Sequence, residues 1–160
     1  MEITENDKRF MRRAIELAMY SVNEKDGGPF GCVIVRNGEV VGEGRNLVTS
    51  ANDPTAHAEV VAIRDACSKL GTFQLDDCTI YTSCEPCPMC LGAIYWARAK
   101  KIYIGCSRED AAAFGFDDAF IYDEIGLDPA KRTIPAIRML NDEAVECFKA
   151  WETDPDKIEY

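Results

Sequence analysis

The sequence predicts an α/β protein in which helices cover the faces of a mixed β-sheet. Two observations support this prediction: helical and strand-like segments alternate along the chain, and a tight turn joins two strand-like segments in its first third. A length of 160 residues suits one domain with one buried core. We therefore expect a single domain over residues 1–160.

The N-terminal segment predicts an amphipathic helix. Apolar side chains recur every three or four residues over residues 4–25. Thr4 and Asp7 are spaced as a capping pair for the first turn of this helix. Gly27-Gly28-Pro29 then interrupts the helical pattern, so we expect the helix to end before these residues.

The next segment predicts a β-hairpin. Residues 31–36 and 39–42 are strand-like, and Asn37-Gly38 between them favours a two-residue primed turn. The two strands should therefore run antiparallel. Residues 46–54 are polar and rich in turn formers, which predicts a loop after the hairpin.

Helices and strands then alternate. A helix is predicted over residues 55–70, and short β-rich runs at 78–82 and 101–105 predict two further strands. Pro86 and Pro88 suit the first turn of a helix between these strands. Another helix should begin near Ser107, and a last one should span residues 142–151, before an aromatic C-terminal tail.

Composition excludes several classes of protein. The net charge of −10 argues against tight binding to a nucleic-acid backbone, which requires a basic surface. The N-terminal residues do not resemble a signal peptide, and no run of eighteen apolar residues occurs, so we expect a cytoplasmic protein without a membrane span. Without a secretory signal, the eight cysteines favour metal ligands and core residues over a disulfide framework.

A cluster of metal-ligand residues is the strongest functional signal. Cys87 and Cys90 are three residues apart, a spacing at which two thiolates on one helical turn converge on a single cation, and His57 is the only histidine. Sulfur and imidazole ligands favour zinc. Three protein ligands leave a fourth tetrahedral position for water, which is typical of a catalytic zinc site.

Glu59 is the predicted catalytic residue. Zinc lowers the pKa of its bound water to about 7, which makes hydroxide available, and Glu59 could carry the protons of that water to a substrate. The combination of H-x-E with P-C-x-x-C is the general signature of zinc nucleobase deaminases. We therefore predict one zinc ion per subunit, held by His57, Cys87 and Cys90, in an enzyme that hydrolyses a C–N bond.

A structural zinc site is the alternative from another functional class. Cys84 lies three residues before Cys87, so both could join Cys90 and His57 in a closed Cys3His site of a non-catalytic protein. Such a site gives no reason for Glu59 to stand beside the histidine.

Beyond the zinc motif, the chain resembles the bacterial guanine deaminases of the cytidine-deaminase-like superfamily. The similar segments are Gly27–Gly31, Asn46, Asn52–Glu59, Ser83–Ala97, Gly115–Asp118 and Glu159-Tyr160. The resemblance implies a three-layer α/β/α fold with a mixed sheet of about five strands. It also implies hydrolysis of guanine, a small-molecule purine, to xanthine and ammonia. Guanosine deaminase is the nearest rival, and deaminases of cytosine or of tRNA adenosine are more distant ones.

The resemblance also implies how the substrate is held. It assigns substrate contacts to Phe30, Asn46, Ala58, Trp96, Asp118 and Tyr160, with Asp117 as an alternative to Asp118. The family forms homodimers in which the C-terminal segment, here about residues 142–160, crosses to the partner subunit and closes its active site. This exchange would explain why the tail is aromatic.

Overall fold

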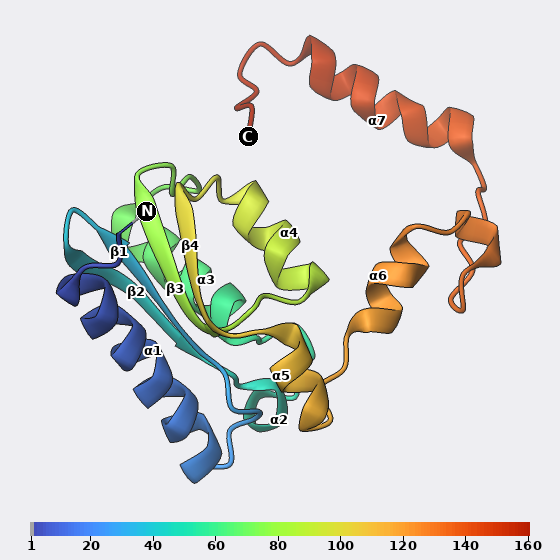
Figure 1. The fold of residues 1–160 in the computed structure, drawn as a ribbon. Coiled ribbons are helices and arrows are strands. Elements are labelled where there is room, and N and C mark those ends of the chain that lie inside the picture. Colours follow the sequence, from blue (N-terminus) through green and yellow to red (C-terminus); the bar gives the residue numbers. More distant parts are fainter. Residues whose placement is uncertain (1) are drawn as a thin grey trace. The chain divides into compact units, whose positions relative to one another are not determined.

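The computed structural model describes residues 2–160, which divide into two compact units, the first ending at Asp118 and the second beginning at Ala119. The first unit has three layers (Figure 1): a β-sheet lies between helix α1, Glu5–Asn23, on one face, and helices α3 and α4 on the other. Helix α3 spans Ala58–Leu70, and α4 spans Pro88–Trp96. This confirms the predicted α/β/α fold.

The sheet is mixed and has four strands in the described chain, close to the predicted number of about five. They are β1 (Gly31–Arg36), β2 (Glu39–Arg45), β3 (Cys78–Cys84) and β4 (Lys101–Cys106), in the spatial order β2-β1-β3-β4. Strand β1 pairs antiparallel with both β2 and β3, whereas β3 and β4 are parallel. Strand β3 therefore lies inside the sheet and leads directly into the segment that carries the cysteines.

Two local predictions are confirmed. The Thr4 side chain accepts a hydrogen bond from the Asp7 backbone N–H, and the Asp7 carboxylate accepts one from the Thr4 N–H, which is a capping box at the start of α1. Asn37 and Gly38 both have positive φ angles, 53° and 82°, as a primed hairpin turn requires.

The sheet is buried by two apolar clusters. The cluster on the α1 side consists of Phe10, Ala14, Leu17, Val33, Val35 and Tyr81. The cluster on the other side contains small residues of α3, namely Ala58, Ala62 and Ala66, packed against apolar residues of the sheet and of α4. Alanine at these positions lets the α3 backbone approach the strands closely.

The approach of α3 to strand β2 is closest at Gly44. A Cβ atom on Gly44 would lie 2.1 Å from the backbone oxygen of Ala58, so no larger residue fits without moving the helix. Ala58 is the first residue of α3. The contact therefore fixes the N-terminal end of this helix against the sheet.

Shorter elements complete the first unit. Helix α2, Val48–Ala51, interrupts the segment predicted to be a loop, and α5, Arg108–Ala113, begins after Ser107 as predicted. All eight cysteines are unpaired, and Cys106 and Cys147 are exposed.

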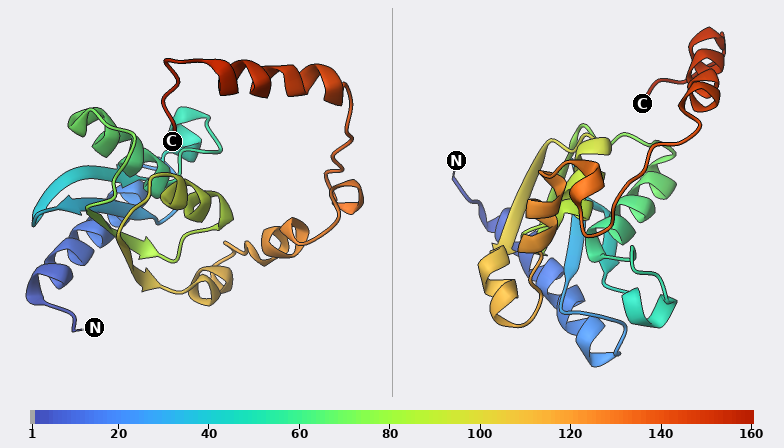
Figure 2. Two further views of the ribbon diagram at one scale, coloured as in Figure 1. Left: turned by 90° about the horizontal axis from the view of Figure 1, so that it is seen from above. Right: turned by 90° about the vertical axis from the view of Figure 1, so that its right-hand side faces the viewer.

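The second unit contains helix α6 (Ala119–Ile125), a 3-10 turn (Pro129–Lys131) and helix α7 (Asn141–Thr153), shown in orange and red in Figure 2. Sequence analysis predicted α7 but not α6. Neither helix has a buried residue. Within residues 2–160, no helix is long and apolar enough to cross a membrane.

Candidate active site

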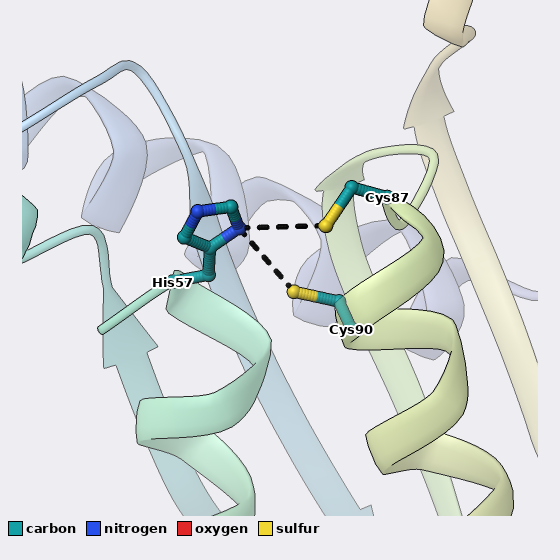
Figure 3. A group of neighbouring side chains, drawn as sticks. All are labelled: His57, Cys87 and Cys90. Carbon is teal, nitrogen blue, oxygen red and sulfur yellow. Dashed lines mark hydrogen bonds between the residues drawn. The ribbon is translucent and has the colours of Figure 1, made fainter. Parts of the chain in front are cut away.

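The predicted metal ligands come together in the structure (Figure 3). Among residues 2–160, the ligand atoms of His57, Cys87 and Cys90 form a group in which all lie within 4.8 Å of one another. His57 directly precedes α3, and Cys87 directly precedes α4, with Cys90 in the first turn of α4. Two helix N-termini thus supply all three ligand atoms.

The spacing of these atoms fits a zinc ion. His57 Nδ1 lies 3.6 Å from Cys87 Sγ and 3.5 Å from Cys90 Sγ. With Zn–S bonds of about 2.3 Å and Zn–N bonds of about 2.0 Å, tetrahedral angles would separate nitrogen and sulfur by about 3.5 Å. The two nitrogen–sulfur distances therefore suit a shared zinc ion, and three protein ligands leave a fourth tetrahedral position available.

The site favours anionic sulfur. The N-terminal ends of α3 and α4 present the positive ends of their helix dipoles to it. In the metal-free site, the hydrogen bond from Cys90 lowers the pKa of Cys87 to about 4. The same bond raises the pKa of Cys90, and the contact with Cys87 raises the pKa of His57. These shifts favour a thiolate at Cys87 and a retained proton at Cys90, so a metal ion would compete with protons for its ligands.

Glu59 lies in the first turn of α3, with only 5% of its surface exposed. Burial raises the pKa of Glu59, whereas hydrogen bonds from its own backbone N–H, from Cys90 and from Thr82 lower it. The Thr82 hydroxyl donates to Glu59 Oε1 at 3.0 Å. A buried carboxylate in contact with a metal ligand has the surroundings typical of a proton-transfer group.

Cys84 does not belong to the ligand group. It is the last residue of β3, it is buried, and its thiol donates to the backbone oxygen of Ser107 at 3.6 Å. The thiol is therefore directed toward the segment that follows β4. This orientation argues against the alternative of a closed Cys3His site.

Asn46 follows β2 and is held by backbone groups. Its side chain is buried, and Oδ1 accepts a hydrogen bond from the Val48 N–H at 3.1 Å. Gly27 makes room for this arrangement, since a Cβ there would lie 2.0 Å from Oδ1. Because the oxygen is engaged, Asn46 has its amide N–H groups to offer to a ligand.

An aromatic contact anchors the segment that leads to Asp118. The rings of Phe30 and Phe116 meet edge-on, with centroids 5.0 Å apart. Asp118 is half-buried, and its pKa is raised first by burial and then by the negative charge of Cys87. Asp118 therefore lies within electrostatic range of a metal ligand, whereas Asp117 is exposed.

The other predicted substrate contacts, Ala58, Trp96 and Tyr160, lie in three different parts of the structure. Ala58 is fully buried at the start of α3. Trp96 is the last residue of α4 and 68% exposed, about 9 Å along the helix axis from Cys90. Tyr160 belongs to the second unit, where its ring meets that of Trp151 edge-on at 6.4 Å. Ala58 is thus beside the metal ligands, and Trp96 is at the opposite end of its helix.

Sequence analysis missed two contacts of this site. Thr82 was assigned to a strand but not to the site, although alternation along β3 puts it on the same face as buried Ile80. That alternation could have marked its hydroxyl as a buried group in need of a partner. Phe116 packs on Phe30 from a distant part of the chain, and no local pattern predicts such a contact.

Comparisons with known proteins agree with this geometry. Residues 4–106 match the family described as the cytidine and deoxycytidylate deaminase zinc-binding region. Guanine deaminase of Bacillus subtilis (strain 168) is 55% identical over 155 residues, which cover 97% of this chain and 99% of that protein. The X-ray structure of guanine deaminase from Bacillus subtilis superposes with a TM-score of 0.93, covering 96% of this chain and 98% of that one.

A more distant relative acts on RNA. The tRNA-specific adenosine deaminase of Bacillus subtilis is 40% identical over 99 residues, which cover 62% of this chain and 61% of that protein. Similarity to this protein is therefore confined to part of each chain, whereas similarity to the guanine deaminase extends over nearly all of both.

Zinc binding to the metal-free protein should release protons. At neutral pH we expect between about one and two protons to be released per zinc ion. Zinc displaces the proton of Cys90, and it displaces a further proton from those molecules in which His57 is protonated. Affinity should fall as pH falls from about 8 to about 5, since protons then compete for the ligands. Calorimetry in buffers of different ionisation enthalpy measures both effects. Cys147→Ser, at an exposed cysteine, is the control, and binding without proton release would contradict the ligand assignment.

Proposed function

The chain belongs to the family of the cytidine and deoxycytidylate deaminase zinc-binding region, and we propose that it hydrolyses guanine to xanthine and ammonia. The observation that carries this proposal is the 55% identity to a guanine deaminase over nearly the full length of both chains. The metal ligands alone would not distinguish among bases, because deaminases of several bases share this ligand motif.

The residues around the metal centre have two separate roles, metal binding and proton transfer. His57, Cys87 and Cys90 hold zinc, and zinc, when bound, is a Lewis acid that lowers the pKa of a coordinated water from about 15.7 to about 7. Overall, a C–O bond forms at C2 of guanine and the bond from C2 to its amino nitrogen breaks. We propose that Glu59 accepts the two protons of the attacking water in turn and delivers one to a ring nitrogen and the other to the departing amine.

Two polar side chains are proposed to select the base. Asn46 offers its amide N–H groups to an acceptor on the purine edge, because its oxygen is engaged by the backbone. Guanine carries donors at N1–H and at the 2-amino group, which suit a carboxylate. We assign that carboxylate to Asp118 rather than Asp117, because Asp118 is half-buried and near Cys87.

Apolar groups are proposed to line the slot for the planar base. The ring of Phe30, which packs against Phe116, would contact the base with its edge or its face. The small, buried side chain of Ala58 would contact the base beside the metal ligands. Trp96 is exposed on α4 and is proposed to add an aromatic surface to the rim of the slot.

The C-terminal segment, about residues 142–160, is proposed to dock on the partner subunit of a homodimer. Helix α7 has no buried residue, and its large apolar side chains Phe148 and Trp151 are 74% and 43% exposed. Docking would cover these side chains and bring Tyr160 to the partner's substrate. A slot closed in this way would exclude the ribose of guanosine.

RNA substrates are disfavoured on electrostatic grounds. A net charge of −10 opposes association with a phosphate backbone, so we propose a free base as substrate in spite of the similarity to a tRNA deaminase. We also propose that the protein acts in the cytoplasm.

The zinc-loaded protein should release ammonia from guanine and not from guanosine, adenine, cytosine or a tRNA anticodon stem. Glu59→Gln keeps the size of the side chain but removes its base, so kcat on guanine should fall by about 10²–10⁴-fold. Metal analysis should find the same zinc content in Glu59→Gln as in the wild type. Turnover of guanosine but not guanine would refute the proposed substrate, and full activity of Glu59→Gln would refute the proton-transfer role.

Deleting the last four residues, Lys157–Tyr160, should lower kcat on guanine by about tenfold or more without removing zinc, because an open site admits bulk water. Tyr160→Phe is the matched variant, since it keeps the ring and removes only the hydroxyl. Ammonia release and zinc content measure the two effects. Unchanged turnover in the truncated protein would show that the tail takes no part in catalysis.

A further inference from the structure

The carboxylate of Glu59 is tied to the sheet by one side chain that is not a metal ligand. The Thr82 hydroxyl donates to Glu59 Oε1 at 3.0 Å. Thr82 is 1% exposed and Glu59 is 5% exposed, so water does not compete strongly for this bond. A hydrogen bond from a hydroxyl to a buried carboxylate is among the stronger kinds in proteins.

Thr82 is a rigid anchor for this bond. It lies in β3, between β1 and β4, and pairs with Cys32 on one side and Ile104 on the other. Its β-branched side chain also restricts rotation about χ1. The position of the hydroxyl is therefore set by the centre of the sheet and not by a loop.

The long side chain of Glu59 needs a second contact to fix the position of its carboxylate. Glutamate has three side-chain torsions, so its carboxylate can reach several positions from the first turn of α3. Engagement of Oε1 by Thr82 restricts this freedom and fixes one carboxylate oxygen against the sheet. Strand β3 also leads to the segment that bears Cys87, so one strand positions both the carboxylate and a sulfur ligand.

We propose that Thr82 is a positioning residue that holds the Glu59 carboxylate in the orientation needed for proton transfer. This inference rests on the proposed function for the role of Glu59. In this role Thr82 acts through Glu59, and no contact with the base is assigned to it. Removing its hydroxyl should therefore affect the chemical step and not substrate binding.

The competing explanation is that the bond only satisfies a buried hydroxyl. A buried hydroxyl needs a hydrogen-bond partner whatever its function, so the bond alone does not decide the question. Thr82→Val and Thr82→Ser separate the two explanations: valine keeps the shape without the donor, and serine keeps the donor without the methyl group. Thr79→Val is the matched control, because Thr79 lies in the same strand on the face opposite to Thr82.

Steady-state kinetics of zinc-loaded protein with guanine is the first measurement. Thr82→Val should lower kcat about ten- to hundred-fold with KM changed by less than about twofold. Thr82→Ser should restore most of kcat, and Thr79→Val should match the wild type. Zinc content and the melting temperature of each variant show whether the site and the fold are intact.

The second measurement does not depend on the substrate. Crystal structures of the zinc-loaded variants should show the Glu59 carboxylate displaced in Thr82→Val and unmoved in Thr82→Ser. If the wild type fails to release ammonia from guanine, the proposed substrate is wrong, while these structures still decide whether Thr82 positions Glu59. An unmoved Glu59 in Thr82→Val overturns the inference. Equal losses of zinc or of melting temperature in the valine and serine variants also overturn it, because the role would then be structural.

Discussion

The convergence of two helix N-termini on one point is the constraint on which this structure depends. Helix α3 brings His57 and α4 brings Cys87, and their ligand atoms lie 3.6 Å apart, as a shared zinc ion requires. The approach depends on Gly44, because any larger side chain there would push α3 off the sheet. The close packing of α3 on the sheet is therefore also what places His57 at the metal site.

The site combines a rigid part with an adaptable part. The metal ligands and Glu59 stand at the beginnings of helices whose backbone is held by packing on the sheet. The groups proposed to choose the base come from connecting segments, with Asn46 after β2 and Asp118 after α5. Related chains could thus keep the hydrolytic centre and change the base through these segments, which agrees with a relative that acts on tRNA.

Local sequence patterns predicted the features that depend on residues close together in the sequence. The Thr4–Asp7 capping box, the Asn37-Gly38 turn and the Cys87–Cys90 pair are each encoded within a few positions. The contacts of Thr82 with Glu59 and of Phe30 with Phe116 depend on strand register and on tertiary packing, so local patterns could not identify the two partners.

Helix α6 was missed for a related reason. Its seven residues are too few to show a helical period, and the structure buries none of them against another element. The position of Trp96 is another feature that the sequence did not give. The sequence places it in the cysteine helix, and the structure shows that it is exposed at the end of α4. Its contact with the substrate stays a prediction.

The coordination of zinc in the isolated protein tests the central claim most directly. X-ray absorption spectroscopy at the zinc edge separates sulfur ligands, at about 2.3 Å, from nitrogen and oxygen ligands, at about 2.0 Å. We predict two sulfur ligands, one imidazole nitrogen and one further light atom from solvent. A third sulfur ligand, which only another cysteine such as Cys84 could supply, would show a closed structural site and contradict the proposed hydrolytic centre.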